Sequence, residues 1–496
     1  MANTTVSATK SLPDGLAFDT SFDVLFRSVD LDSEIPESWT SLQAYIARVA
    51  EANTDRNDLH IHEVAVASLQ IVPGKSLEFQ ICCNTLKVYT AAIRPSSLHI
   101  PTKIDSGRVT FTLERAIDFM VEINGDKWQA LHLLVTYVDA QAPSSDGNGI
   151  WYFGTGVNNG AASSKIIDGA LIIPSETTVY LAHGAILTAQ VQFVDVKNSA
   201  VKGPGIIFRP AYEAESSSRP RELAGGAILI ERSKNITVQS VTSLRSFGFS
   251  LCVGEGQDIH IDRYRSLSGY GNGDGIDLFC CKDVLVENCF LRNSDDTIAI
   301  YGHRWNYYGD TQNIRINNCT LLPDIAHPIH IGTHGNPQVP ETLSDIYISN
   351  IDILDHCEHQ MWYQGCISIN AGDENLIHDV LVENVQVEKI TKGQLFNIRT
   401  MKNAMWTTAP GRGVKNVTFR NVELHTNRSS LVYPSQVLGF ERGRGVEGVM
   451  FEQLTIGGKV VHDDMQKPKW YMVSDFVPAF VNEHVVDLVF KLNDSK

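Results

Sequence analysis

The heptapeptide DVLVENC, residues 283–289, decides the fold, because it is one of eight variants of the same phrase between residues 198 and 422. Apolar and polar residues alternate within most copies, as in a strand with one buried face. Successive copies are 23 to 37 residues apart, a spacing typical of solenoid rungs with loops of variable length. The copies begin at Asn198, Asn235, Asp258, Asp283, Asn313, Asp345, Asp379 and Asn416.

No single rung can hide its apolar face, so the rungs must stack to form a core. The repeats therefore predict an all-β protein with a right-handed parallel β-helix. A propeller or a stack of hairpins would need a tight two-residue turn in every repeat, and no such turn recurs. A ninth rung is expected around residues 448–454, followed by a C-terminal tail that caps the open end.

The residues before the repeats predict a separate domain. Residues 14–57 mix apolar and polar residues without clear turn signals, and residues 38–49 suit an amphipathic helix. Short alternating runs separated by Pro, Gly and Asp then predict an antiparallel β-sandwich, and AQAPSSDGNG at 140–149 reads as a linker. We therefore expect a sandwich domain at 1–145, with a leading irregular or helical segment, and a β-helix domain at 146–496. The expected strands are 62–72, 76–81, 86–93, 108–113, 119–123 and 131–137.

Composition limits the partners. The 496-residue chain is 43% apolar and has no run long enough for a membrane span. Its net charge of −16 argues against nucleic acid and, more mildly, against a polyanionic polymer. Nine cysteines without a CxxC pair indicate neither a metal knuckle nor a disulfide scaffold. Cys289 and Cys319 occupy the same slot of the repeat, where we expect them to stack in the core.

The start of the chain is polar and has no signal-peptide pattern, whereas six Asn-x-Ser/Thr sequons are compatible with secretion. We expect a secreted protein whose leader is absent from this sequence, with an intracellular protein as the alternative. We also expect a monomer that acts on a carbohydrate or another small molecule.

Three aspartates are the candidate catalytic residues. NGDGID at 272–277 contains Asp274, and SDDTIAI at 294–300 contains Asp295 and Asp296. Asp274 and Asp295 are 21 residues apart, about one rung, and neighbouring parallel strands lie about 4.8 Å apart. Crowded carboxylates cannot all ionise cheaply, so one should keep its proton beside a base, as cleavage of a glycosidic bond requires.

Two other interpretations of the aspartates are open: a polar ladder that caps the rung turns, or a calcium site. No EF-hand spacing is present, and we expect neither a metal nor a cofactor. Asp295 and Asp296 would point to opposite faces of an ideal strand, so both can serve one site only if the backbone bends.

Further candidates surround the aspartates. His327, in AHPIHIG on the next rung, could orient a carboxylate or a substrate hydroxyl. The segment GHRWNYYGD offers aromatic faces that stack on sugars, and FNIRTMKN offers two cations that could bind sugar hydroxyls. Core packing and surface salt bridges are the plain alternatives for these residues. The expected substrate-binding residues are Asn272, His303, Trp305, Tyr307, His327, Arg399 and Lys402.

These motifs resemble a clan of β-helical glycoside hydrolases that contains the polygalacturonases of family 28 and the dextranases and isopullulanases of family 49. NGDGID resembles the polygalacturonase NTD motif, SDDTIAI its DD motif, and AHPIHIG is similar to its GHG motif. TVYLAHGAILTA, DDTIAIYG, LFNIRTMKN, LTIGGKVV and the preceding sandwich are similar to dextranases, which places the chain nearer that branch.

The resemblance implies that Asp295 is the general acid and that Asp274 and Asp296 hold the water of an inverting displacement. The RIK tripeptide of polygalacturonases is not intact, because Thr400 and Met401 follow Arg399.

Three hypotheses result. The first is an inverting glycosidase acting on α-linked bonds of a neutral saccharide such as dextran or pullulan. The second is an isomerase, lyase or cyclase that acts on a small molecule on the same scaffold. The third is a carbohydrate-binding or adhesive protein whose aspartates are structural.

Overall fold

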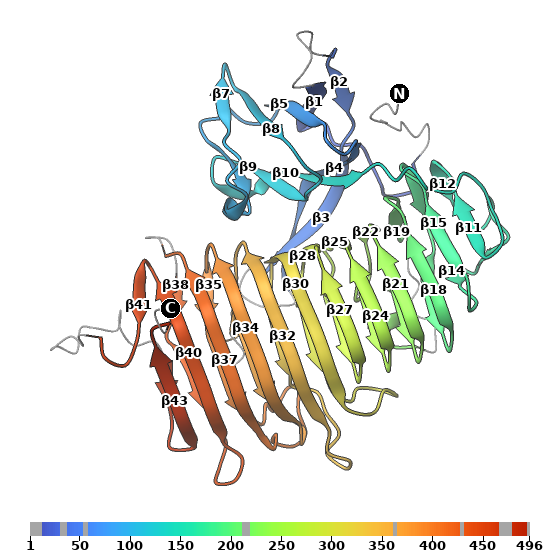
Figure 1. Cartoon of the computed structure of the whole chain (residues 1–496). Coiled ribbons are helices and arrows are strands. Elements are labelled where there is room, and N and C mark those ends of the chain that lie inside the picture. The colour runs from blue at the N-terminus through green and yellow to red at the C-terminus, as the bar shows by residue number, and fades with distance from the viewer. Residues whose placement is uncertain are drawn as a thin grey trace.

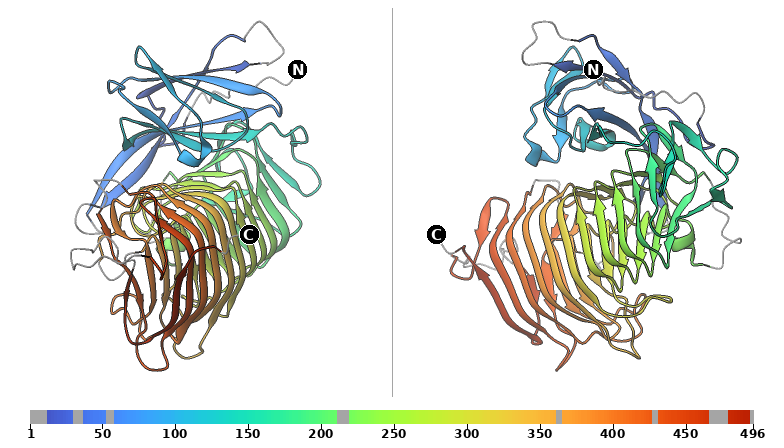
Figure 2. Two further views of the ribbon diagram at one scale, coloured as in Figure 1. Left: turned by 60° about the vertical axis from the view of Figure 1, so that its left-hand side comes forward. Right: turned by 45° about the vertical axis from the view of Figure 1, so that its right-hand side comes forward.

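The computed structural model describes residues 12–29, 37–52, 58–210, 219–360, 365–426, 431–465 and 479–493. These residues form an N-terminal domain of two sheets and a long stack of parallel rungs (Figure 1). The views in Figure 2 show the rungs stacked along one axis, with the N-terminal domain against one side of the stack. The predicted right-handed parallel β-helix is confirmed.

The N-terminal domain contains two five-stranded sheets that enclose an apolar core. One pairing within it is parallel, between β4 and β10, so the domain is not wholly antiparallel as expected. The first sheet has the order β2 (Thr40–Leu42), β1 (Phe22–Val29), β5 (Ser76–Cys83), β8 (Arg108–Leu113) and β7 (Lys103–Asp105). The second has the order β3 (Tyr45–Ala52), β4 (Leu59–Ile71), β10 (Asp126–Tyr137), β9 (Phe119–Ile123) and β6 (Ala91–Arg94).

The helix expected at residues 38–49 is wrong, because this segment contains β2 and the first half of β3. Tyr45, Ala47 and Val49 are buried, and β3 pairs along its whole length with β4. A short run of mixed apolar and polar residues fits either the helical or the strand period, and here the pairing with β4 selects the strand.

The repeated phrases form the long sheet of the solenoid. Their strands pair in parallel at the register expected from the sequence, with Ile236, Ile259, Val284 and Ile314 opposite one another. The C-terminal residues add a further strand, β43 (Val485–Lys491), which pairs with β40 as another rung. The repeat strands are β18 (Lys197–Lys202), β21 (Lys234–Gln239), β24 (Gln257–Asp262), β27 (Lys282–Glu287), β30 (Thr311–Pro323), β32 (Thr342–Ile353), β34 (Leu376–Val387), β37 (Gly413–Leu424) and the ninth rung β40 (Val446–Ile456).

A turn requirement explains why each phrase begins with Asn or Asp. The first residue of every copy has a positive φ, for example 55° at Asn235 and 57° at Asp283. Asn and Asp adopt this left-handed conformation at lower cost than other side chains. Their side chains also bond from rung to rung, as in the 2.8 Å bond from Asn235 Nδ2 to Asn198 Oδ1. The polar ladder and the strand register therefore have the same origin.

A second parallel sheet lies across the core and positions the candidate site. Its inward residues, such as Ile276, Ile298 and Ile329, join the core that runs through the solenoid. Cys289 and Cys319 are also buried in this core and form no disulfide, which confirms their expected role. The strands nearest the site are β26 (Ile276–Phe279), β29 (Ile298–Tyr301), β31 (Ile329–Gly332), β33 (Ile367–Ala371) and β36 (Phe396–Thr400).

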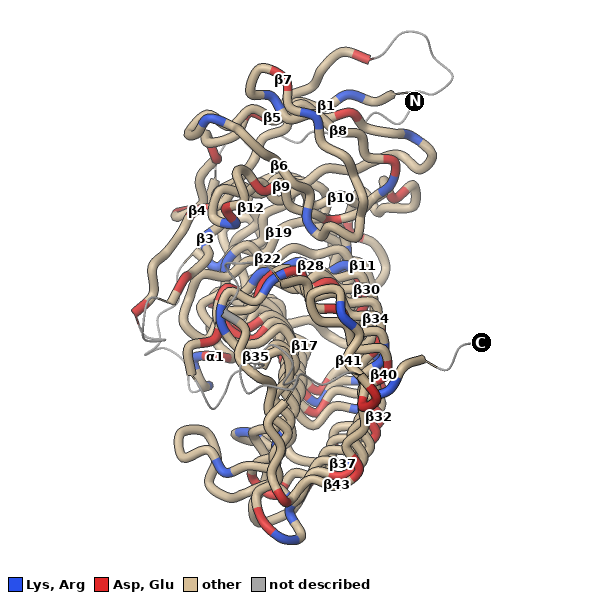
Figure 3. The backbone as a smooth tube through the Cα atoms, turned by 90° about the vertical axis from the view of Figure 1, so that its left-hand side faces the viewer, with Lys and Arg blue, Asp and Glu red and all other residues tan. Residues whose placement is uncertain are grey.

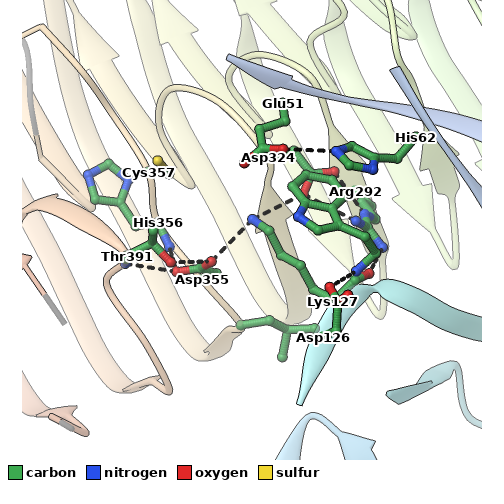
Figure 4. A network of polar contacts seen from close by, with 12 residues as sticks. Glu51, His62, Asp126, Lys127, Arg292, Asp324, Asp355, His356, Cys357 and Thr391 are labelled. Atoms are coloured by element: carbon green, nitrogen blue, oxygen red, sulfur yellow. Dashed lines mark hydrogen bonds and ion pairs between the residues drawn. The ribbon is translucent and has the colours of Figure 1, made fainter. Parts of the chain in front are cut away.

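A buried ionic network joins the two domains (Figure 4). Lys127 Nζ, on β10, lies 3.2 Å from Asp324 Oδ1 and 3.1 Å from Asp355 Oδ2, both on the solenoid. Arg292 Nε donates to Asp324 Oδ2 at 2.8 Å, and both side chains of that pair are fully buried. Burial alone lowers the pKa of Lys127, but Asp355 and Asp324 outweigh that effect and raise it. The lysine is therefore held charged at the domain junction.

Charged residues elsewhere are interspersed over both domains (Figure 3). Within the described ranges, no helix is long and apolar enough to cross a membrane.

Replacing Lys127 by Met should destabilise the protein, because Asp324 and Asp355 would keep their burial and lose a counter-charge. We expect the free energy of unfolding to fall by about 3 kcal/mol, measured by urea unfolding with circular dichroism. Lys103→Met, on the exposed strand β7, is the matched control and should change it by less than about 0.5 kcal/mol. Equal stability of the two variants would contradict this role for Lys127.

Candidate active site

Asp274, Asp296 and His327 occupy equivalent places on three successive rungs, just before β26, β29 and β31. Two backbone bonds fix this stacking: Gly275 N–H donates to the Asp296 carbonyl, and Thr297 N–H donates to the His327 carbonyl, each at 2.9 Å. The residue one rung from Asp274 is therefore Asp296, not Asp295 as the sequence spacing suggested. A Cβ at Gly275 would lie 2.3 Å from the Thr297 carbonyl oxygen, so glycine permits the close approach.

A bend lets both adjacent aspartates serve one site. Residues 294–297 interrupt the strands between β28 (Phe290–Asn293) and β29. Ser294 anchors this bend, since its hydroxyl donates to the Tyr270 carbonyl at 2.6 Å. Asp295 and Asp296 are 3% and 4% exposed and line the same pocket. The alternation of an ideal strand is broken where the two carboxyl groups must converge.

The three aspartates meet in a pocket of about 40 Å³. Each contributes one carboxylate oxygen, and these oxygens lie within 4.8 Å of one another. The sequence thus identified three side chains that the fold brings together. The pocket is lined by Phe249, Asn272, Asp274, Asp295, Asp296, Tyr301, Arg304, His334 and Trp406.

Asp296 is held by groups on two successive rungs. Its Oδ1 accepts the backbone N–H of His327 at 3.0 Å and lies 2.7 Å from His327 Nδ1. The Tyr301 hydroxyl donates to its Oδ2 at 3.1 Å. The position expected for His327, beside a carboxylate, is where the structure places it. This arrangement fixes Asp296 as a hydrogen-bond acceptor.

Asp277 is a fourth carboxyl group that sequence reasoning did not include. It is fully buried on β26 beside Asp274, and neither of its carboxylate oxygens has a hydrogen-bond partner among the described residues. Burial raises the pKa of Asp277 well above its ordinary value, and the charges of Asp296 and Asp295 raise it further, whereas Arg304 opposes them. The crowding of carboxyl groups expected from the sequence therefore contributes to the raised pKa of Asp277.

Arg304 and His334 line the pocket, and the sequence predicted neither of them as a site residue. The Arg304 guanidinium lies 4.3 Å from the Trp305 ring centroid, and within the described residues it forms no ion pair. Burial lowers the pKa of His334 well below its ordinary value, and the charge of Arg304 lowers it further, so the ring is neutral. Arg304 lies inside GHRWNYYGD and His334 comes two residues after AHPIHIG, but local sequence does not indicate which side chain of a loop turns inward.

Several expected substrate-binding residues do not line the pocket. The Tyr307 ring is buried, and its hydroxyl donates to Glu231 at 2.5 Å, so this ring offers no face to a sugar. The His303 ring nitrogen Nδ1 contacts the Tyr307 carbonyl at 2.6 Å, and Trp305 packs on Phe279 with ring centroids 5.5 Å apart. Arg399 lies on β36, two rungs beyond His327, and burial lowers its pKa.

Lys402, just after β36, is exposed and likewise lies outside the pocket lining. Asn272 is the expected binding residue that does line the pocket, and its amide donates to Glu222 at 3.3 Å.

Two sets of three side chains among the described residues could hold a metal ion. One is the aspartate trio, and the other consists of Asp296, His327 and His330. His330 is already engaged by neighbouring hydroxyls, with Thr333 Oγ1 2.8 Å from its Nε2 and Ser368 Oγ 3.0 Å from its Nδ1. The expectation that the protein uses no metal stays a prediction.

Residues 167–459 match glycosyl hydrolases family 28. The chain belongs to this family. Family 28 membership supports glycoside hydrolysis, and the expected placement nearer the dextranase branch is not confirmed.

Among curated relatives, a polygalacturonase of Chamaecyparis obtusa is 26% identical over 202 residues, which cover 40% of this chain and 36% of the relative. A probable polygalacturonase of Arabidopsis thaliana is 23% identical over 238 residues, 46% of this chain and 48% of the relative. The chain thus spans about a third to a half of the length of these relatives.

Two solved structures are similar to the family 28 chain over most of its length. Dex49A from Penicillium minioluteum aligns with a TM-score of 0.49 at 14% identity and covers 96% of each chain. The family 28 exopolygalacturonase of Yersinia enterocolitica aligns with a TM-score of 0.45 at 12% identity, over 98% of this chain and 100% of that one.

Replacing Asp277 by Asn should make the protein more stable at neutral pH. The raised pKa means that folded Asp277 keeps its proton above pH 3.8, where the unfolded chain loses it. Stability therefore falls as pH rises from 3.8 through the raised pKa, and Asn, which cannot ionise, removes that loss. We expect the variant to melt at a higher temperature than wild type at pH 7, with a much smaller difference at pH 3.5, by differential scanning calorimetry. An equal difference in melting temperature at pH 7 and at pH 3.5 would contradict a raised pKa of Asp277.

Proposed function

We propose that this protein hydrolyses α-glycosidic bonds of a poly- or oligosaccharide with Asp274, Asp295 and Asp296 as its acid and base groups. The observation that carries the proposal is the convergence of their three carboxylate oxygens within 4.8 Å in one pocket. Hydrolysis needs a proton donor for the departing oxygen and a carboxylate that activates water, and a cluster of carboxyl groups supplies both.

Distinct roles follow from the contacts of each carboxyl group. Asp296 accepts bonds from the His327 N–H and the Tyr301 hydroxyl, which suits a group that holds the attacking water. Asp274 lies one rung away on the same side and shares this role. Asp295 remains as the proton donor to the leaving oxygen. His327 acts through Asp296 and is a positioning residue.

Inversion is the proposed stereochemical course. It rests on the resemblance of the aspartate motifs and not on the distances. The nearest carboxylate oxygens lie within 4.8 Å of one another, closer than the roughly 6.5–9.5 Å usual for inverting pairs. This short separation is nearer the roughly 5–5.5 Å of retaining pairs, so the resemblance is what supports inversion.

Two substrate classes compete for the pocket. Acidic galacturonan is favoured by the curated relatives, which are polygalacturonases, and by Arg304, whose guanidinium could bind a sugar carboxylate in a bidentate manner. Neutral dextran or pullulan is favoured by the acidic net charge and the broken RIK motif. We propose galacturonan first, because the charge beside the reacting bond matters more than the distant surface charge. Secretion and a monomeric state stay proposals.

Reducing-sugar release from polygalacturonate, dextran, pullulan and arabinan tests the activity and the substrate class. We expect release from polygalacturonate, and a loss of at least about a hundredfold in Asp295→Asn, which keeps the shape of the side chain and removes the acid. Release from dextran or pullulan alone would reverse the order of the two substrates. Silence across the panel would favour the small-molecule enzyme or the carbohydrate-binding protein.

The anomer released first tests the stereochemical course. We expect β-configured product from an α-linked substrate, followed by proton NMR before mutarotation. An α-configured first product would show that one aspartate attacks carbon directly, so that a retaining mechanism replaces the proposed one.

A further inference from the structure

A second cavity, of about 440 Å³, lies between the N-terminal domain and the solenoid. The N-terminal domain contributes Arg48 and Glu63, and the solenoid contributes Arg221 and Arg245. Its volume lies within the roughly 300–1,000 Å³ of small-molecule sites. This arginine cavity, defined by these four residues, is more than ten times larger than the pocket of the three aspartates.

The charge of the arginine cavity is unbalanced. Three guanidinium groups face one carboxylate, and Glu63 pairs with Arg48 at 3.5 Å. Arg221 and Arg245 form no ion pair with any carboxylate in the part of the chain that the structure describes. Burial lowers the pKa of Arg245, and the neighbouring charge of Arg48 lowers it further. A bound anion would relieve this repulsion, in a chain whose net charge is −16.

Aromatic rings hold the guanidinium groups in place. Arg221 lies 4.3 Å from the Tyr270 ring centroid, and Arg245 lies 4.7 Å from that of Phe247. Phe247 and Tyr270 meet edge to face, with centroids 5.3 Å apart. Stacked guanidinium groups lose little freedom when they bind a planar carboxylate. The apolar side chains beside them suit the faces of a sugar ring.

Both domains are needed to build the arginine cavity. Gly15 has a φ of 84°, and a Cβ at this position would lie 2.5 Å from Arg245 Nη1. The glycine therefore lets the N-terminal segment lie directly on this guanidinium. On the solenoid side, Tyr270 and Gly271 line the cavity and lead into Asn272, which lines the aspartate pocket. The two sites are neighbours on one loop.

We propose that the arginine cavity binds a carboxylate-bearing sugar, as a second subsite outside the catalytic pocket that both domains build together. The proposal rests on the proposed function only in taking an acidic saccharide as the ligand. Such a sugar has two sources: a uronate unit of a chain that also occupies the aspartate pocket, or a free sugar acid that binds by itself.

Calorimetric titration of the full chain tests this proposal, with Asp295→Asn as the parent so that no ligand is hydrolysed. The ligands are galacturonate, trigalacturonate, glucose and inorganic sulfate. We expect galacturonate to bind the parent, and to bind at least tenfold more weakly after Arg245→Gln or Arg221→Gln. Arg108→Gln, an exposed arginine on β8, is the matched control and should leave binding unchanged. Arg245→Lys keeps the charge and should recover part of the affinity, with circular dichroism confirming that each variant is folded.

The comparison of ligands and variants separates the outcomes. Tighter binding of trigalacturonate than galacturonate, lost in both cavity variants, would identify a uronate unit of a longer chain, whereas equal binding would identify a free sugar acid. Unchanged affinity after Arg245→Gln, or sulfate binding as tight as galacturonate, would overturn the proposal. A loss of galacturonate binding in Arg304→Gln but not in Arg245→Gln would overturn the proposal and leave the proposed hydrolysis intact. Arginine-dependent binding without hydrolysis of any polymer would retain this subsite and reject the hydrolase.

Discussion

The in-register stacking of parallel rungs is the constraint on which the rest of this structure depends. Each phrase begins with Asn or Asp at a positive φ, which turns the chain into the next strand at the same place on every rung. Parallel pairing then aligns the inward isoleucines and valines into one continuous core. Because neighbouring parallel strands lie about 4.8 Å apart, any residues that precede equivalent strands must also lie close together.

The aspartate cluster uses this stacking and departs from it at one point. Asp274, Asp296 and His327 are aligned by backbone bonds between rungs. Asp295 is added by a bend, anchored by Ser294, that interrupts the strand alternation. The result is a group of four buried carboxyl groups, including Asp277, whose raised pKa reflects its burial and its charged neighbours. A rigid solenoid can hold such repulsion because its many ladder bonds resist relaxation.

Local charge and net charge give opposite indications about the ligand. The chain as a whole is acidic, yet Arg304 lines the aspartate pocket and three arginines line the cavity at the domain junction. Surface charges more than about 8–10 Å away are screened at physiological ionic strength, so the groups inside a cavity decide what binds there. The N-terminal domain contributes to this arrangement, and the Lys127 network and an apolar cluster at the junction hold it against the rungs.

The sequence by itself determined the solenoid, its register and the aspartate trio, because one strand phrase repeated eight times leaves few other ways to bury its apolar face. It could not place Arg304 or His334 in the pocket, nor remove Tyr307 from it, because loop side chains have no period that fixes their direction. The sequence also predicted a helix where β3 pairs with β4, since the conformation of a short segment of mixed apolar and polar residues depends on the strand beside it. Only the tertiary structure decided these points and the arginine cavity, because contacts between residues far apart in the chain, such as Gly15 on Arg245, depend on how the two domains dock.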